Sequence, residues 1–165
     1  MTGPYRIGQG YDIHRLVPGK PLKVGGVLIE SPVGSEAHSD GDVLLHALID
    51  ALLGACALGD IGDHFPPSDA QYKNADSVAL LQKIMPLIQE KGYAIGNLDA
   101  TIFLEKPKLG PYKQQIAEKL SSCLEIAVGD ISIKAKTAEK FPPLGTQEAI
   151  AASVTTLLTN RASLI

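Results

Sequence analysis

Apolar and polar residues alternate along the start of the chain, in the segment YRIGQGYDIHR over residues 5–15. Successive side chains of a β-strand point to opposite faces, so this alternation predicts a strand. One face carries Tyr5, Ile7, Tyr11 and Ile13, and the other carries Gly8, Gly10, Asp12 and His14. The two glycines leave room on the second face for the close approach of another element.

Residues 43–58, VLLHALIDALLGACAL, are apolar or small at nearly every position. A helix that is apolar on all sides belongs in a protein interior, so we predict a buried helix, with Ser39 and Asp42 at the spacing of a helix-start signal. Two polar residues, His46 and Asp50, interrupt it four positions apart and share one face. Burying an unpaired imidazole or carboxylate costs about 1–3 kcal/mol. A compensating partner is therefore expected, and a metal ion is a candidate.

Further elements are predicted from the same kinds of pattern, the alternation of a strand and the spacing of apolar residues in a helix. Short apolar runs on either side of Gly25-Gly26 predict a hairpin over residues 21–30. Helices are expected over residues 77–91, capped by Ser77, and from the turn at 107–111 to about residue 124, and strands over residues 97–104 and 131–136. The segments 31–37, 60–74 and 137–146 are expected to be loops.

The last segment, after residue 149, is compatible with two structures. Its apolar residues fit a helix, but consecutive β-branched residues at 154–156 favour a strand, which is our prediction. The expected total is about four long strands and three helices. This set predicts an α/β (α+β) sandwich, in which a mixed four-stranded sheet carries helices on one face, with a small β-hairpin beside it. The bare sheet face would need cover, so an oligomer is expected.

Composition narrows the class of protein. The chain has 165 residues, enough for one domain spanning residues 1–165, and 45% of them are hydrophobic. A net charge of −3 gives no general attraction to nucleic acid or anionic membranes. No apolar run is long enough to span a bilayer, and the N-terminus has no signal-peptide layout. Cys56 and Cys123 form no CxxC pair and are expected to be buried free thiols, which fits a cytoplasmic location.

A metal site is the main chemical hypothesis from these patterns. Asp12 and His14 project side by side from the strand, and His46 lies on the buried helix. One carboxylate and two imidazoles suit zinc with one open coordination position. Asp50 is expected to hold the other ring nitrogen of His46, a common supporting arrangement. The plain alternatives are a backbone-bonded Asp12, a surface His14 and a hydrogen-bonded core histidine at position 46.

Several longer motifs stand in a distinctive order: RIGQGYDIHR, HSDGDVLLHALIDALLGACALGDIG, FPPSD, GNLDATI, KPKLGP and IKAKTAEK. Together they resemble the 2-C-methyl-D-erythritol 2,4-cyclodiphosphate synthase family from Arg6 to about Leu158. The resemblance implies a homotrimer with an active site at each subunit boundary. It also implies one divalent metal per subunit, usually zinc, held by Asp12, His14 and His46.

The resemblance further implies a reaction of the non-mevalonate isoprenoid pathway. The substrate is 4-diphosphocytidyl-2-C-methyl-D-erythritol 2-phosphate, a small cytidine diphosphate molecule. Its 2-phosphate attacks the β-phosphorus, CMP leaves, and a cyclic diphosphate forms. Because the attack is intramolecular, much of the catalysis lies in holding the folded substrate with its ends in line.

The family's site residues carry over to positions of this chain. His38 and Thr137 match positions that steady the phosphoryl group, Ser39 can donate to a phosphate oxygen, and Glu139 matches the ligand of a second cation, Mg²⁺ or Mn²⁺. The sugar end matches Asp60, Ile61 and Gly62, with a mobile loop of Phe65, Pro66, Pro67, Ser68 and Asp69. The cytidine diphosphate pocket of a neighbouring subunit matches Lys106, Pro107, Lys108, Leu109, Gly110, Lys136, Thr137, Ala138 and Glu139.

The chain departs from the family's commonest pattern at a few positions. Lys136 and Ala138 stand where many members have Thr, and Pro143 and Thr146 stand where some have an aromatic residue and an Arg. That Arg is associated with an isoprenoid diphosphate in the central channel. Two other classes remain open at this point: a zinc phosphohydrolase that uses metal-bound water, and a non-catalytic nucleotide-binding or structural metal module. A structural zinc site would have a fourth protein ligand, typically Cys.

Overall fold

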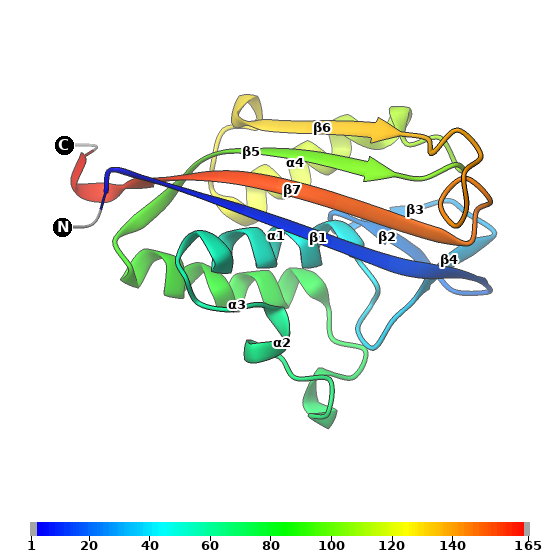
Figure 1. The fold of residues 1–165 in the computed structure, drawn as a ribbon, viewed down its shortest axis with the longest axis horizontal. Coiled ribbons are helices and arrows are strands. Elements are labelled where there is room, and N and C mark those ends of the chain that lie inside the picture. The colour runs from blue at the N-terminus through cyan, green and yellow to red at the C-terminus, as the bar shows by residue number, and fades with distance from the viewer. Residues whose placement is uncertain (1–2, 164–165) are drawn as a thin grey trace.

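A computed structural model describes residues 3–163 and contains a mixed five-stranded sheet in the order β4-β1-β7-β5-β6 (Figure 1). The strands are β1 (Tyr5–Pro18), β4 (Val33–Glu36), β5 (Tyr93–Phe103), β6 (Ile131–Lys136) and β7 (Ala149–Asn160). Only β5 and β6 pair in parallel. The single-domain prediction for residues 1–165 also covers residues 1–2 and 164–165, which lie outside the described part.

The prediction of four strands was wrong by one, because β4 was expected to be a loop. Its four residues, VGSE, have no apolar alternation. They are held by antiparallel pairing with the end of β1, in which Arg15 lies opposite Glu36 and Pro18 opposite Val33. The ambiguous last segment is a strand, as predicted, and β7 lies in the middle of the sheet between β1 and β5.

The three long helices lie on one face of the sheet, as predicted (Figure 1). They are α1 (Val43–Ala55), α3 (Ser77–Glu90) and α4 (Lys113–Leu124). The buried helix α1 packs on β1 and β7, α3 packs on α1 and β5, and α4 packs on β6. A Cβ atom on Gly8 or Gly10 would overlap the carbonyl oxygens of Ala51 or Ala47 in α1. The glycines therefore let β1 and α1 touch backbone to backbone.

The predicted hairpin consists of β2 (Leu22–Val24) and β3 (Val27–Ile29), joined at Gly25-Gly26. Both glycines have positive φ, +62° and +77°, as a tight hairpin turn requires. Their N–H groups donate to the two carboxylate oxygens of Asp42 at 2.8 and 2.6 Å. Asp42 also caps α1 by accepting the N–H of Leu45, so this residue, and not Ser39, starts the helix.

Two further boundaries differ from the predictions. The segment 60–74 contains a short helix, α2 (Ile61–His64), and a 3₁₀ turn, η1 (Ala70–Tyr72), rather than irregular loop alone. A capping box of Asp60 and Asp63 starts α2. At α3 the cap position belongs to Asp76, and Ser77 is already the first helical residue. The remaining 3₁₀ turns are η2 (Gly110–Tyr112), η3 (Val128–Asp130) and η4 (Arg161–Ser163).

The face of the sheet opposite the helices is apolar along β1. Tyr5, Ile7, Tyr11 and Ile13 are 64%, 72%, 52% and 43% exposed. Exposure of such a row to water is unfavourable, and large exposed apolar patches mark interaction sites. Within residues 3–163, no helix is long and apolar enough to cross a membrane.

Candidate active site

Asp12, His14 and His46 meet where β1 crosses the first turn of α1. Their ligand atoms all lie within 4.8 Å of one another. Asp12 Oδ2 is 3.1 Å from His14 Nε2 and 3.0 Å from His46 Nδ1, and the two ring nitrogens are 3.1 Å apart. The other oxygen of Asp12 accepts the N–H of Ile13 at 2.9 Å. One carboxylate and two imidazoles converge here as predicted, and this donor set fits a divalent transition metal such as zinc.

The electrostatics of Asp12 favour its ionised form. Burial by itself would raise the pKa of Asp12, but hydrogen bonds with His14 and His46 outweigh burial and hold the pKa well below its usual range. A carboxylate that stays ionised is the form that binds a metal ion. Asp12 therefore does more than accept a backbone hydrogen bond, because it also contacts both histidines.

The second ring nitrogen of His46 has partners that the sequence did not indicate. His46 Nε2 lies 2.9 Å from Ser39 Oγ and 3.0 Å from Ser77 Oγ. The prediction that Asp50 supports His46 was wrong. Asp50 Oδ1 accepts the N–H of Ile61 at 2.7 Å and so holds the start of α2. Burial, more than any other cause, raises the pKa of this carboxyl.

A cavity of about 400 Å³ opens beside the three side chains. Its lining includes predicted site residues from three motifs, His14, His38, Ser39, His46, Ile61, Gly62, Phe65 and Pro67. Ala37, Tyr72 and Leu80 also line it and were not predicted. Tyr72 meets Phe65 edge to face with ring centroids 5.2 Å apart. An aromatic residue shortly after the FPPSD motif was the only sequence signal that could have indicated Tyr72.

Other predicted residues of this region shape the loop instead of lining the cavity. Asp60 Oδ1 accepts the N–H of Asp63 at 3.1 Å, and Asp69 Oδ1 accepts the N–H of Gln71 at 3.0 Å. Pro66 and Ser68 lie between Asp60 and Asp69 in sequence. Neither is among the described residues that line this cavity. The carboxylates therefore fix the turns that present Ile61 and Phe65.

The residues predicted for the nucleotide pocket lie at the far ends of β5 and β6. A second cavity, of about 430 Å³, is lined by Lys106, Pro107 and Lys108 together with Ser31, Pro32, Val33 and Gln147. The hydroxyl of Thr137 donates to Glu139 Oε1 at 2.7 Å, and Glu139 is exposed with φ +48°. Within one chain, Lys106, Pro107 and Lys108 therefore line a different cavity from the one beside the three candidate ligands.

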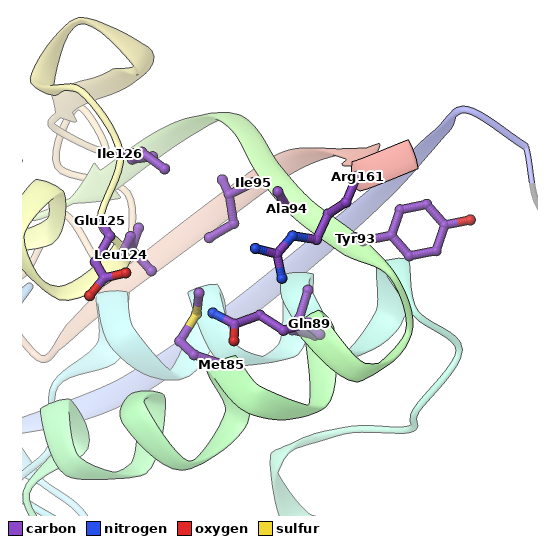
Figure 2. Close-up of a pocket in the computed structure, with 10 residues that line it drawn as sticks. Met85, Gln89, Tyr93, Ala94, Ile95, Leu124, Glu125, Ile126 and Arg161 are labelled. Atoms are coloured by element: carbon purple, nitrogen blue, oxygen red, sulfur yellow. The ribbon is translucent and has the colours of Figure 1, made fainter. Parts of the chain in front are cut away.

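A third cavity, of about 190 Å³, lies near the C-terminal ends of α3 and α4 (Figure 2). Met85, Gln89, Glu125 and Arg161 are among its lining residues. None of the predicted site residues lines it. It is therefore separate from the candidate active site.

Comparisons with known proteins place this geometry in a family. The YgbB family model matches residues 5–159. A 2-C-methyl-D-erythritol 2,4-cyclodiphosphate synthase from Thermosynechococcus vestitus is 54% identical over 93% of this chain and 95% of its own length. A synthase of the same name from Porphyromonas gingivalis is 52% identical over 96% of this chain and 98% of its own length.

The solved structures agree with the sequence relatives. The CDP complex of IspF from Plasmodium falciparum superposes with a TM-score of 0.86, at 36% identity, over 98% of this chain and 99% of that protein. Likeness of this extent covers both the sheet and the helices. The chain belongs to the YgbB family, together with the 2-C-methyl-D-erythritol 2,4-cyclodiphosphate synthases.

Proposed function

We propose that this chain, as a single domain, is a lyase that converts 4-diphosphocytidyl-2-C-methyl-D-erythritol 2-phosphate to 2-C-methyl-D-erythritol 2,4-cyclodiphosphate and CMP. The observation that carries the proposal is the meeting of Asp12, His14 and His46 beside a cavity lined by the family's motifs. The named relatives match this chain over nearly its whole length. The reaction belongs to isoprenoid precursor synthesis by the non-mevalonate route.

In this proposal Asp12, His14 and His46 hold one Zn²⁺ per chain. When bound, the ion would supply Lewis-acid chemistry toward a phosphoryl oxygen. Three protein ligands are the number typical of catalytic zinc sites, whereas structural zinc sites use four. A structural zinc site is disfavoured because, among the described residues, neither cysteine joins the group of candidate ligand atoms: Cys56 follows the C-terminal end of α1, and Cys123 lies on α4.

The chain's own groups then bind and orient the substrate. His38 and Ser39 line the cavity next to His14 and His46, where a phosphate would lie. The Ser39 hydroxyl oxygen accepts the N–H of Gly41 at 3.2 Å, which leaves its proton available for a phosphate oxygen. Ile61 and Gly62, held by Asp50 and Asp60, form the wall for the methylerythritol unit.

Water must be excluded from the phosphorus atom, because hydrolysis would otherwise compete with ring closure. The segment Phe65–Asp69 lies over the cavity through Phe65 and Pro67. Phe65 packs edge to face on Tyr72. We assign this aromatic pair to the closure of the cavity over the bound sugar, which favours a cyclase over a phosphohydrolase.

The nucleotide end is assigned to the other group of motif residues. Lys106 to Gly110 and Lys136 to Glu139 would hold the cytidine diphosphate, and Glu139 would bind Mg²⁺ or Mn²⁺ together with the substrate diphosphate. The hydrogen bond from Thr137 orients the Glu139 carboxylate. The relative from Plasmodium falciparum, solved as a CDP complex, supports a cytidine diphosphate ligand.

A homotrimer would bring the two groups together. Within one chain, Lys106, Pro107 and Lys108 line a different cavity from His14 and His46. The exposed apolar row on β1 also favours a partner. A heterologous, ring-closing interface buries such a row and joins unlike surfaces of neighbouring subunits. In this arrangement the residues that bind zinc and the sugar in one subunit face the residues that bind the nucleotide in the next. The proposed enzyme is cytoplasmic and has no nucleic-acid or membrane partner.

The direct test is to incubate the protein with 4-diphosphocytidyl-2-C-methyl-D-erythritol 2-phosphate and to identify the products by mass. The proposal predicts cyclic diphosphate and CMP in equal amounts. A linear phosphate product would support the hydrolase. Binding of the substrate without turnover would support a non-catalytic nucleotide module.

A further inference from the structure

The ring of His46 is held from both sides. Its Nδ1 faces Asp12 and His14, and its Nε2 faces two serine hydroxyls, those of Ser39 and Ser77. Ser77 is fully buried at the first position of α3. Nδ1 is therefore the nitrogen placed to bind a metal, and any proton on the ring must then lie on Nε2.

The hydroxyl of Ser77 is committed elsewhere as a donor. It donates to Asp40 Oδ1 at 2.5 Å, and a hydroxyl has only one proton to give. Toward His46 it therefore offers only lone pairs. If Nε2 also carried only a lone pair, the two lone pairs would face each other over the 3.0 Å between Nε2 and Ser77 Oγ with no proton between them. This contact therefore requires Nε2 to carry the proton.

Asp40 is fixed as an ionised acceptor. Lys23 Nζ on β2 lies 3.1 Å from Asp40 Oδ2, which also accepts the N–H of Ser77 at 3.3 Å. Burial would raise the pKa of Asp40, but hydrogen bonds from Ser77 and Lys23 outweigh it and lower the pKa below its usual range. The chain of contacts thus runs from the hairpin through Asp40 and Ser77 to His46.

We propose that Ser77, oriented by Asp40, is a positioning residue that accepts the Nε2 proton of His46 and keeps Nδ1 aimed as a metal ligand. Groups that hold the second nitrogen of a metal-binding histidine fix its tautomer and ring orientation. This inference rests on the metal role proposed above for His46. Ser39, the other neighbour of Nε2, keeps its own proton for the cavity that it lines.

Zinc affinity, measured by competition with a coloured chelator, tests the inference without any assay of turnover. Ser77→Ala should weaken zinc binding by about 10–100-fold, the usual cost of losing such a supporting partner. Ser77→Thr keeps the hydroxyl and should retain most of the affinity. The matched control is Ser35→Ala, which removes another buried serine hydroxyl that touches no candidate ligand; its affinity should equal that of the wild type.

A spectroscopic signature separates positioning from a general loss of structure. In the zinc-loaded wild type, the Nε2 proton of His46 should give a ¹H–¹⁵N signal that exchanges slowly with water. In Ser77→Ala the signal should shift and exchange faster, and in Ser35→Ala it should not change. The wild-type measurement stands even where a variant fails to fold: a rapidly exchanging Nε2 proton in the wild type would overturn the inference.

The outcomes distinguish this inference from the proposed function. If the wild type binds zinc and Ser77→Ala binds it equally well, Ser77 is not the positioning residue and the metal site stands. If Ser39→Ala loses affinity and Ser77→Ala does not, Ser39 is the acceptor and the inference is wrong. A wild type that binds no zinc overturns the metal role and this inference together.

Discussion

At the scale of the residue, the ionisation of Asp12 gives a test of the site without any metal. Its pKa is lowered in the folded protein by contacts with His14 and His46. A lowered folded pKa stabilises the fold above the ordinary pKa of about 4 and loses that contribution as pH falls toward the folded value. In chelator-treated protein, Asp12→Asn should therefore be less stable than the wild type at pH 6.

The difference in the free energy of unfolding between Asp12→Asn and the wild type should become smaller below about pH 4, because the wild-type carboxylate then takes up its proton. Urea unfolding at pH 6, 4 and 3 measures it. The control is Asp130→Asn, because Asp130 is exposed and lies in η3, far from the triad in sequence. A gap that is constant with pH would show that the Asp12 carboxylate has no favourable contact with the two histidines.

Glu139 gives a second prediction at this scale. If Glu139 binds only the second cation, Glu139→Gln should keep its zinc, lose most activity, and need more Mg²⁺ or Mn²⁺, or no longer respond to them. Glu125→Gln is a matched control, because Glu125 is also exposed with a left-handed φ, +56° against +48° for Glu139. Elemental analysis and activity against Mg²⁺ concentration measure both. An unchanged metal requirement in Glu139→Gln would remove Glu139 from the site.

Strand alternation was enough to predict the candidate ligands but not what surrounds them. Asp12 and His14 had to share a face once residues 5–15 formed a strand, and the apolar helix isolated His46. The partner Ser77 lies 31 residues beyond His46, and only tertiary packing brings α3 to it. Asp50 shares a helix face with His46, but its carboxylate turns to the free N–H of Ile61. Spacing along a helix therefore predicts proximity but not the choice of partner.

At the scale of the element, the contact between β1 and α1 sets the geometry of the site. A Cβ atom on Gly10 would overlap the backbone of α1 at Ala47, next to His46. Gly10→Ala should push the helix away and cost about 3 kcal/mol or more, the upper range of overpacking. It should also weaken zinc binding, because His46 moves with the helix.

The helix itself supplies the control for Gly10→Ala. A Cβ atom on Gly54, also in α1, would meet nothing within 4 Å. Gly54→Ala should be neutral or stabilise the protein by about 0.5–1 kcal/mol, since glycine is a poor helix former. Chemical denaturation measures both variants. Equal effects would contradict the close backbone packing of β1 on α1.

The elements that the sequence did not predict are the ones held by other parts of the fold. The strand β4 has no apolar alternation and exists through its pairing with β1. The short helix α2 lacks a buried face and depends on its capping box and on Asp50. By contrast, the hairpin turn was predictable because Gly25 and Gly26 meet a local requirement for positive φ.

At the scale of the whole molecule, the apolar row on β1 and the separation of the two site groups support the proposed homotrimer. His46→Ala should damage only the zinc group of residues, and Glu139→Ala only the nucleotide group. Each variant alone should be nearly inactive. When the two are unfolded, mixed equally and refolded, about a quarter of the subunit boundaries should pair two intact groups and recover activity.

Both variants must first be shown to form trimers by mass measurement. Each variant refolded alone serves as the baseline for the mixture. Mixed trimers with no more activity than the separate variants would show that the groups are not shared between subunits. The sheet face of β1 would then need a different explanation.

Titration of the metal-free protein with zinc tests the central claim most directly, namely that Asp12, His14 and His46 hold the ion required for ring closure. The amounts of cyclic diphosphate and CMP formed are measured against zinc added per chain, with Mg²⁺ present throughout. Activity should rise in proportion to zinc and level off near about one equivalent per chain in the wild type, and should not rise in His46→Ala. Full activity without zinc, or the same rise in His46→Ala, would contradict the account.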